Sequence, residues 1–282
     1  MTDSSRCSDL LLTVLVTVLA ALFPLRAYSQ QDVWSLPLYK ETVTVNAVTY
    51  GSAFARDTYL SQSRYEGWAV GFEDDRWKGY NPDKLFNVGR THSSILFSPM
   101  KNRLGGGSTL QLAGTVYHGW LWHAVENDRC DLLVGPACMM NLGVLYDRQN
   151  SNNPVNVEGF VAAGVCVDNT FRFRLFYYPM ALQASFYMPL AGVGFAPDYD
   201  LPYWMAFRYN DYGKFIHFIT PFNNVALSQQ VALMVPVRGD RFRIGYTLDF
   251  NKNRLGGHST RLLNGMFSIG YAMRFETKKW NR

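Results

Sequence analysis

The sequence is poor in cysteine. Four cysteines occur in 282 residues, and Cys7 lies close to the amino terminus. Cys130, Cys138 and Cys166 are an odd number without Cys-x-x-Cys spacing, which argues against a disulfide framework and a cysteine zinc site. Cys130 and Cys138 fall on one expected strand, about 26 Å apart, so they cannot pair. We expect free thiols and leave a Cys138–Cys166 bridge open.

Charged residues are also scarce, at 17% of the chain, with a formal net charge of +5. No block of lysine and arginine stands out, so no nucleic-acid partner is expected. The sequence has neither a phosphate-cradling loop nor a zinc motif, and no carboxylates have a spacing that suggests acid–base catalysis. We therefore predict no cofactor and no metal, and the balance is against an enzyme.

Only one long apolar run is present. It covers residues 10–25, follows a short polar stretch with Arg6, and precedes Ala27-Tyr28-Ser29. This order is typical of a cleaved signal peptide, and an uncleaved membrane anchor is the alternative. The predicted organisation is a signal peptide at 1–29 and a single outer-membrane β-barrel domain at 30–282.

What the chain contains instead is strict alternation. In residues 241–250 the even positions are aromatic or aliphatic, and the odd positions are arginine, glycine, threonine and aspartate. Residues 266–275 alternate in the same way. Successive side chains leave opposite faces of a strand, and about ten tilted residues cross a bilayer. The two segments therefore predict the closing hairpin of a membrane barrel, apolar outside and polar inside.

The same alternation continues through the earlier chain. It predicts an all-β fold, namely a transmembrane antiparallel up-and-down β-barrel of about twelve strands. The expected strands are 41–54, 64–74, 85–100, 109–123, 132–146, 155–167, 171–188, 203–209, 214–220, 225–237, 241–250 and 266–275.

Loop lengths support this topology. Short turns on the periplasmic side and longer loops outside are usual in such barrels. The longer loops are expected around Asp57, Gly105, Ser151, Phe195 and Gly256. The expected tight turns are 126–129, 168–170, 210–213 and 238–240.

Parity places several charges on the inner face. If Phe242 faces lipid, the arginines of the last strands point inward, with Asp249 and Glu158 as expected partners because an unpaired buried charge is costly. Either the interior is ion-paired and largely plugged, or it is a narrow pore that favours anions. The predicted lumen charges are Arg172, Arg174, Arg241, Arg243, Arg274, Asp249 and Glu158.

A nine-residue repeat joins two distant parts of the chain. Residues 101–109 recur as 252–260, and only Gly107 is changed, to His258. One interpretation is a shared hairpin turn in which glycine supplies positive φ. The other is a basic surface patch that holds lipopolysaccharide phosphates or a glycan. The residues of this patch would be Lys101, Arg103, Lys252 and Arg254.

One pair of residues allows an alternative function. His92 and Ser94 are two apart on an expected strand, so both point to one face and the histidine could take the serine proton. A twelve-stranded outer-membrane phospholipase uses this spacing, but there Asn-Gly follows, whereas Ile-Leu follows here. A membrane-embedded lipid hydrolase of this type is the runner-up hypothesis.

A family resemblance is carried by three stretches, 51–61, 150–154 and 189–199, and continues at 243–246 and 269–271 near the carboxyl end. In these stretches the chain is similar to an uncharacterised family of exported Bacteroidetes proteins, catalogued as a domain of unknown function. The resemblance implies an envelope location and a barrel, and it brings no reaction or catalytic residue. This chain differs from the family at Gln62, where the family usually has proline, and at 199–204.

These observations converge on one prediction. We expect a bacterial outer-membrane barrel with a structural or surface-interaction role, or a narrow anion-favouring channel. The expected partners are outer-membrane lipid, lipopolysaccharide and, during insertion, the barrel-assembly machinery. The sequence does not indicate an oligomeric state or a transported molecule.

Overall fold

The structure is a computed structural model that describes residues 35–102, 106–150, 154–175, 178–198, 208–210, 212–237 and 240–276. Nearly all of these residues lie in long antiparallel strands. The strands are β1 (Glu41–Asp57), β2 (Tyr65–Gly79), β3 (Val88–Asn102), β4 (Ser108–Glu126), β5 (Cys130–Asp147), β6 (Val155–Leu175), β7 (Tyr178–Phe195), β8 (Ile216–Ile219), β9 (Asn224–Val237), β10 (Asp240–Leu255) and β11 (His258–Glu276).

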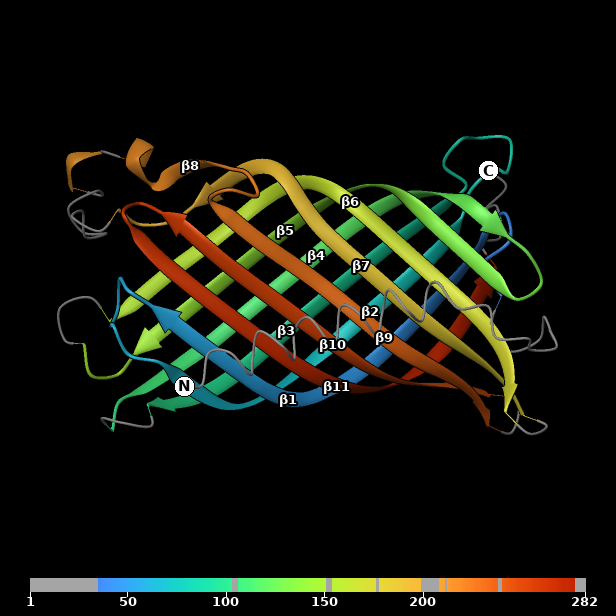
Figure 1. Ribbon diagram of the computed structural model, residues 1–282, viewed down its shortest axis with the longest axis horizontal. Coiled ribbons are helices and arrows are strands. Elements are labelled where there is room, and N and C mark those ends of the chain that lie inside the picture. Colours follow the sequence, from blue (N-terminus) through green and yellow to red (C-terminus); the bar gives the residue numbers. More distant parts are fainter. Residues whose placement is uncertain are drawn as a thin grey trace, which may run out of the picture.

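The sheet closes on itself. Each strand from β1 to β7 pairs with the next, β7 pairs with β9, and β11 pairs with both β10 and β1. Ten strands therefore form an antiparallel barrel, and β8 lies outside it, paired only with β7 (Figure 1). We call the end at Asp57 and His258 the loop end, and the end at Glu41 and Glu276 the terminal end.

The expected number of about twelve strands is wrong. Of the predicted strand 214–220, only 216–219 is a strand, and it follows a short 3-10 turn at Tyr212–Phe215. Four residues span about 13 Å, which is too short to cross a bilayer. Most of the predicted strand 203–209 lies outside the described residues. The barrel still has an even number of strands, so the first strand begins and the last strand ends at the same end of the barrel.

The predicted tight turn at 168–170 is also wrong. These residues lie inside β6, where Asn169 pairs with Leu132 of β5 and Thr170 with Gln183 of β7. Asp168 and Thr170 face the lumen, because alternate side chains of a strand point to the same side. Asp168 is buried and accepts hydrogen bonds across the lumen. A run of polar residues resembles a turn in sequence, but in a barrel it can be the inner face of a strand.

The second copy of the repeat also differs from its prediction. The expected long loop around Gly256 is a two-residue turn, because β10 continues to Leu255 and β11 begins at His258. Gly256 and Gly257 have positive φ values of 57° and 76°. In the first copy Gly106 has φ 70°. Both copies are therefore hairpin connections at the loop end, with glycine in the left-handed region. The turn expected at 210–213 is not a barrel turn either, since it precedes β8.

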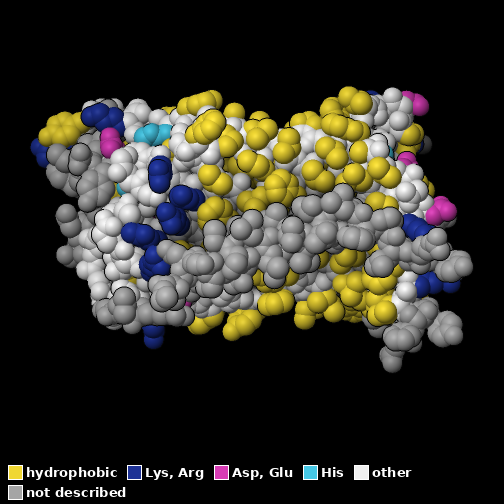
Figure 2. Space-filling view, in the orientation of Figure 1, with side chains coloured by type: hydrophobic (Ala, Val, Ile, Leu, Met, Phe, Trp, Pro, Cys, Tyr) yellow, Lys and Arg dark blue, Asp and Glu magenta, His cyan; other side chains and the backbone are white. Residues whose placement is uncertain are grey.

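The outer face of the barrel is apolar. Every barrel strand exposes large apolar side chains at its outward positions. They are mostly Phe, Ile, Val, Leu and Trp, as at Val70, Ile95 and Phe267. Figure 2 shows them covering the middle of the visible face, with lysine and arginine toward the ends. Such a belt is the surface that lipid covers in membrane barrels. We call it the apolar belt.

Several smaller predictions can be compared with the fold. Cys130, Cys138 and Cys166 are free, and Cys138 is exposed whereas Cys166 is buried. The predicted signal peptide at 1–29 lies outside the described residues. Helical turns in the described part are all too short to cross a membrane.

Candidate functional site

The lumen is crossed by polar side chains at two levels. At the first level, Arg90 of β3 donates to Asp168 of β6 at 2.5 Å and to Gln230 of β9 at 2.9 Å. In a ring of ten strands, β3 and β9 are five steps apart in either direction. Arg90 and Gln230 therefore join diametrically opposite walls of the barrel.

Asp75 is the acceptor at the centre of this level. It receives hydrogen bonds from Arg243 of β10, from Arg90 at 3.2 Å and from Gln230 at 3.0 Å, and it contacts His92 Nδ1 at 3.0 Å. Arg90, Asp75 and Arg243 are all buried. Buried charges are tolerated when they are paired in this way, and removing one partner typically costs about 3–5 kcal/mol.

Aromatic rings pack around the charges. Arg90 lies over the rings of Trp77 and Tyr117 at 5.1 and 5.7 Å. Tyr117 is stacked on His92 and on Tyr187, with centroids 4.9 and 5.2 Å apart. These rings fill the space between the ion pairs, so this level of the lumen is packed as a protein core is packed.

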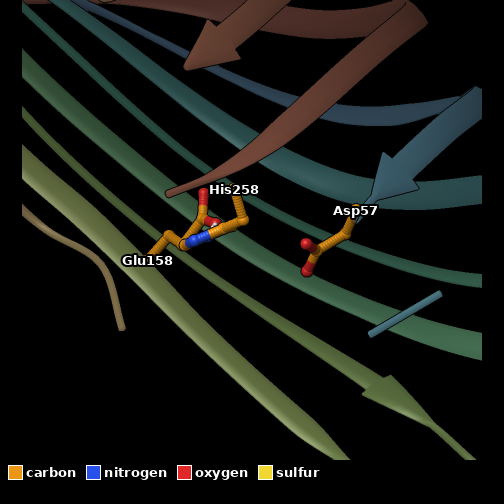
Figure 3. A group of neighbouring side chains, drawn as sticks. All are labelled: Asp57, Glu158 and His258. Atoms are coloured by element: carbon orange, nitrogen blue, oxygen red, sulfur yellow. Dashed lines mark hydrogen bonds and ion pairs between the residues drawn. The ribbon is translucent and has the colours of Figure 1, made fainter. Parts of the chain in front are cut away.

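The second level lies at the loop end and contains the candidate site. His258 Nε2, from the first residue of β11, is 3.0 Å from Glu158 Oε1 of β6. Asp57, the last residue of β1, reaches toward this pair from the strand next to β11, opposite Glu158 (Figure 3). Atoms of the three side chains that could bind a metal lie within 4.8 Å of one another.

Amide and hydroxyl groups complete this site. Asn156 donates to Asp57 at 2.5 Å and to Glu158 at 2.8 Å. Glu158 also accepts from Asn253 at 2.7 Å and from Thr260 at 2.6 Å. Because β1 and β6 are five strands apart in either direction, the contact between Asn156 and Asp57 again joins opposite walls.

Burial and charge change the acidity of the groups at the strand ends. Asp57 and His258 are terminal residues of their strands and lie beyond the apolar belt. Burial, and then the neighbouring charge of Glu158, raises the pKa of Asp57 to about 6. Burial by itself lowers the pKa of His258, but the hydrogen bond to Glu158, together with the negative charges of Glu158 and Asp57, raises this pKa overall. The arrangement favours an imidazolium–carboxylate pair beside an easily protonated acid.

The same three residues offer a donor set for a divalent cation. One imidazole and two carboxylates suit zinc or manganese. In the structure these atoms already bond to each other and to amides. A metal would have to displace the bond between Glu158 and His258. Without a metal, Asp57, Glu158 and His258 form a hydrogen-bonded bridge across the lumen.

The predicted lumen charges lie in different surroundings. Arg243 bonds to Asp75, Glu158 bonds to His258, and neither has the expected partner. Asp249 lines a lumen cavity with Ser94, and its Oδ1 is buried without a hydrogen bond. The others lie nearer the rims: Arg172 bonds to Asp131 on the adjacent strand, Arg174 is exposed, Arg241 is half-buried, and Arg274 bonds to Glu41 and Ser35 at the terminal end.

The runner-up catalytic pair faces the lumen. His92 is buried and oriented by Asp75, and Ser94 lines a cavity of about 40 Å³ in the lumen. No hydrogen bond joins His92 and Ser94 among the described residues, and His92 Nε2 is buried without a partner. The orienting carboxylate that sequence could not identify is therefore present, while the contact between base and nucleophile is not made.

The described cations of the repeat do not lie side by side. Lys101 is on β3, and Lys252 and Arg254 are on β10. Three strands, β2, β1 and β11, separate β3 from β10, so the two strands are about 19 Å apart measured along the sheet. Arg103 lies outside the described residues.

Sequence reasoning missed the residues that cross the lumen. Asp75 was left outside the expected strand 64–74, Asp168 was placed in a turn, and Asp57 was placed at a loop. A usable signal existed for His258, because it is the single change between the two copies of the repeat. No signal in the sequence identifies Arg90 and Gln230 as partners, since the contact depends on barrel closure.

Comparison with known proteins gives a family and a set of similar folds. The family described as "Protein of unknown function (DUF3316)" matches residues 10–280. No curated protein matches the chain.

Three solved structures illustrate the similar folds. The outer membrane protease OmpT from Escherichia coli has 7% identity and a TM-score of 0.48, covering 87% of this chain and 100% of that chain. An outer membrane channel from Pseudomonas putida F1 has 10% identity and a TM-score of 0.38, covering 88% and 100%. The β domain of the Bordetella autotransporter BrkA has 13% identity and a TM-score of 0.37, covering 83% and 99%. None of these similarities is close enough to transfer an activity.

Proposed function

This chain belongs to the DUF3316 family of proteins of unknown function, and we propose that it is an integral β-barrel of a bacterial outer membrane whose lumen is closed. Its role is then carried by the loop end and the outer surface, and solutes do not pass through it. The support is physical: a closed ten-stranded ring has no free edge, and its outer face is apolar where lipid would lie.

One observation carries the closed lumen. Two hydrogen bonds at different levels join strands that face each other across the full width of the ring. They are the bond from Arg90 to Gln230 and the bond from Asn156 to Asp57. A side chain that spans the lumen occupies the path an ion would take. Buried ion pairs at the first level hold these side chains in place.

The channel hypothesis is less well supported. The cavities in the lumen between the two levels measure about 20 and 40 Å³. A water molecule needs roughly 10–15 Å³ measured in this way, so each cavity holds about one to three waters. Isolated waters do not make a conducting path. The buried arginines of the lumen are also neutralised, Arg90 by Asp168 and Arg243 by Asp75, so these two do not form a free anion site.

The hydrolase hypothesis has a different difficulty. A lipid substrate reaches a barrel from the outside, but His92 and Ser94 point into the packed interior. We expect purified protein to show no lipid hydrolysis above that of Ser94→Ala, measured by release of fatty acid from mixed micelles. Hydrolysis that disappears in Ser94→Ala and in His92→Ala would favour the enzyme instead.

Membrane integration can be tested directly. We expect the expressed chain to sediment with the outer membrane, to resist extraction by alkaline carbonate, and to need detergent for solubility. A folded barrel also migrates differently in sodium dodecyl sulfate before and after boiling, because the unboiled barrel stays compact. Protein that remains soluble without detergent would refute the proposal.

The remaining partners belong to the same proposal. An outer-membrane barrel contacts lipid on its apolar belt and lipopolysaccharide at the loop end if that end faces the exterior. Its insertion requires the barrel-assembly machinery. The connection between β7 and β9 is the long one and begins at the loop end, whereas the connections after β4, β6 and β9 at the terminal end have two or three residues and the one after β2 has eight. This asymmetry supports an outward-facing loop end.

A further inference from the structure

Three cations stand side by side on the outer face of the barrel near the loop end. Arg56 of β1 lies opposite Arg261 of β11, and Arg261 lies opposite Lys252 of β10. Neighbours of these residues along the strands, such as Asp57, Thr260 and Asn253, are buried and face the lumen. Alternation therefore directs the three cations outward. Arg254 follows Lys252 two residues later on the same face and is exposed.

We call Arg56, Arg261, Lys252 and Arg254 the basic row. Like charges directly opposite on neighbouring strands destabilise a sheet, so such a row needs a compensating anion. Among the described residues none of the four has an ion pair, and Arg56 Nε is buried without a hydrogen bond. Glu66 of β2 lies opposite Phe54, not opposite Arg56.

The residues below the basic row are apolar. Phe54, Leu263 and Phe250 lie on the same three strands, two residues nearer the middle of the barrel than Arg56, Arg261 and Lys252. They pair with one another across the strands. The basic row therefore stands at the edge of the apolar belt, on three adjacent strands. Figure 2 shows lysine and arginine gathered between the apolar middle and the loop end of the visible face.

We propose that the basic row binds the phosphate groups of a lipid in the outer leaflet, with the acyl chains against Phe54, Leu263 and Phe250. Neighbouring strands are about 4.8 Å apart, so the three outer cations lie within roughly 10 Å of one another. Guanidinium groups bind phosphate in a bidentate manner, and lysine adds a mobile positive charge. A headgroup with phosphate monoesters, such as that of lipid A, matches this chemistry. The inference rests on the proposed function for its membrane placement.

The structure thereby changes the partners of the basic patch suggested by the repeat. Lys252 and Arg254 remain, but Arg56 and Arg261 on the adjoining strands replace Lys101 and Arg103. The repeat supplies only one side of the site. The other cations come from strands that closure of the barrel brings next to β10.

The test measures lipid bound to the purified barrel in neutral detergent. Native mass spectrometry would compare the wild type with the triple variant Arg56→Gln/Lys252→Gln/Arg261→Gln, using lipid A with both phosphates. Each surface cation near an anionic headgroup contributes roughly a fivefold gain in affinity, so we expect a loss of about 100-fold. A matched control is Lys40→Gln/Arg76→Gln/Lys78→Gln, which removes three cations at the terminal end and should bind as the wild type does.

Two further arms identify the ligand. Dephosphorylated lipid A should bind as weakly to the wild type as to the triple variant, and inorganic phosphate alone should not compete at equal concentration. Equal binding by the wild type and the triple variant would overturn the proposal, as would equal loss in the control. If the triple variant fails to fold, Lys252→Gln alone should still weaken binding. A barrel that integrates into membranes but fails these arms refutes this inference and leaves the proposed function intact.

Discussion

At the scale of single residues, His258 has the largest consequence. The same position in the first copy of the repeat is Gly107, so the second copy differs by one imidazole that crosses to Glu158. Glu158 also accepts hydrogen bonds from Asn253 and Thr260, and these bonds would remain if His258 were replaced. What would be lost is the positive partner of a buried carboxylate.

His258→Ala should destabilise the folded barrel by up to about 3–5 kcal/mol, because Glu158 is left buried without its cation. Adding Glu158→Gln should restore part of this loss, since the neutral amide needs no cation. The measurement is the temperature at which the compact form is lost on gels without boiling. If the double variant is less stable than His258→Ala, the pair is not the reason for the effect.

Asp57 should make stability depend on pH in a defined direction. Its pKa in the folded protein is about 6, above the ordinary value of 3.8, so the folded form binds the proton more tightly. The contribution of Asp57 to the free energy of unfolding therefore falls as the pH rises from about 4 through 6. Asp57→Asn should show a smaller loss of stability between pH 5 and pH 7.5 than the wild type.

The control for this experiment is Asp83→Asn, because Asp83 is exposed in the connection between β2 and β3. That variant should keep the pH profile of the wild type. An unchanged profile in Asp57→Asn, or the same change in both variants, would show that Asp57 does not titrate as the site geometry implies.

At the scale of elements, hairpin connections distinguish the two copies of the repeat. Gly106 and Gly256 both have positive φ, but a Cβ added to Gly106 meets nothing within 4 Å. A Cβ added to Gly256 would lie 2.2 Å from the carbonyl oxygen of Pro197. The second hairpin therefore packs against the segment that follows β7, and the first does not.

Gly106→Ala should cost about 1–2 kcal/mol, the usual penalty for an alanine in the left-handed region. Gly256→Ala should cost clearly more, because backbone atoms must also move away from the new methyl group. Unfolding temperatures of the two variants provide the comparison. Equal effects would mean that the segment at Pro197 does not rest on the second hairpin.

Strand positions and faces were largely predictable from the sequence, because each strand shows its two-residue period without reference to its neighbours. The outward residues of the closing hairpin, such as Ile244 and Ile269, were assigned correctly by alternation alone. Turns were less predictable. Asp168 was read as a turn residue, since a polar lumen and a polar loop have the same composition.

The candidate site could not be predicted in the same way. Contacts such as Arg90 with Gln230 join residues 140 positions apart and depend on how many strands close the ring. With about twelve strands, β3 and β9 would not face each other at this distance. Alternation along each strand predicts which charged side chains point into the lumen. Which of these side chains contact one another depends on how the ring closes.

At the scale of the whole molecule, we propose a membrane barrel whose lumen is sealed at two levels and whose outer rim is basic on one part. The seal consists of side chains from opposite walls, and the rim consists of adjacent strands. The two features are independent, so loss of the basic row should leave the lumen closed. Activity in this account depends on what the outer surface binds.

The central claim is the closed lumen, and single-channel recording in a planar bilayer tests it most directly. Folded wild-type protein should insert without producing steady conductance steps, while Arg90→Ala/Gln230→Ala, which removes the bridge between β3 and β9, should produce small steps. Insertion must be confirmed by protection of the strands from protease. Steady, anion-selective steps from the wild type would contradict the account.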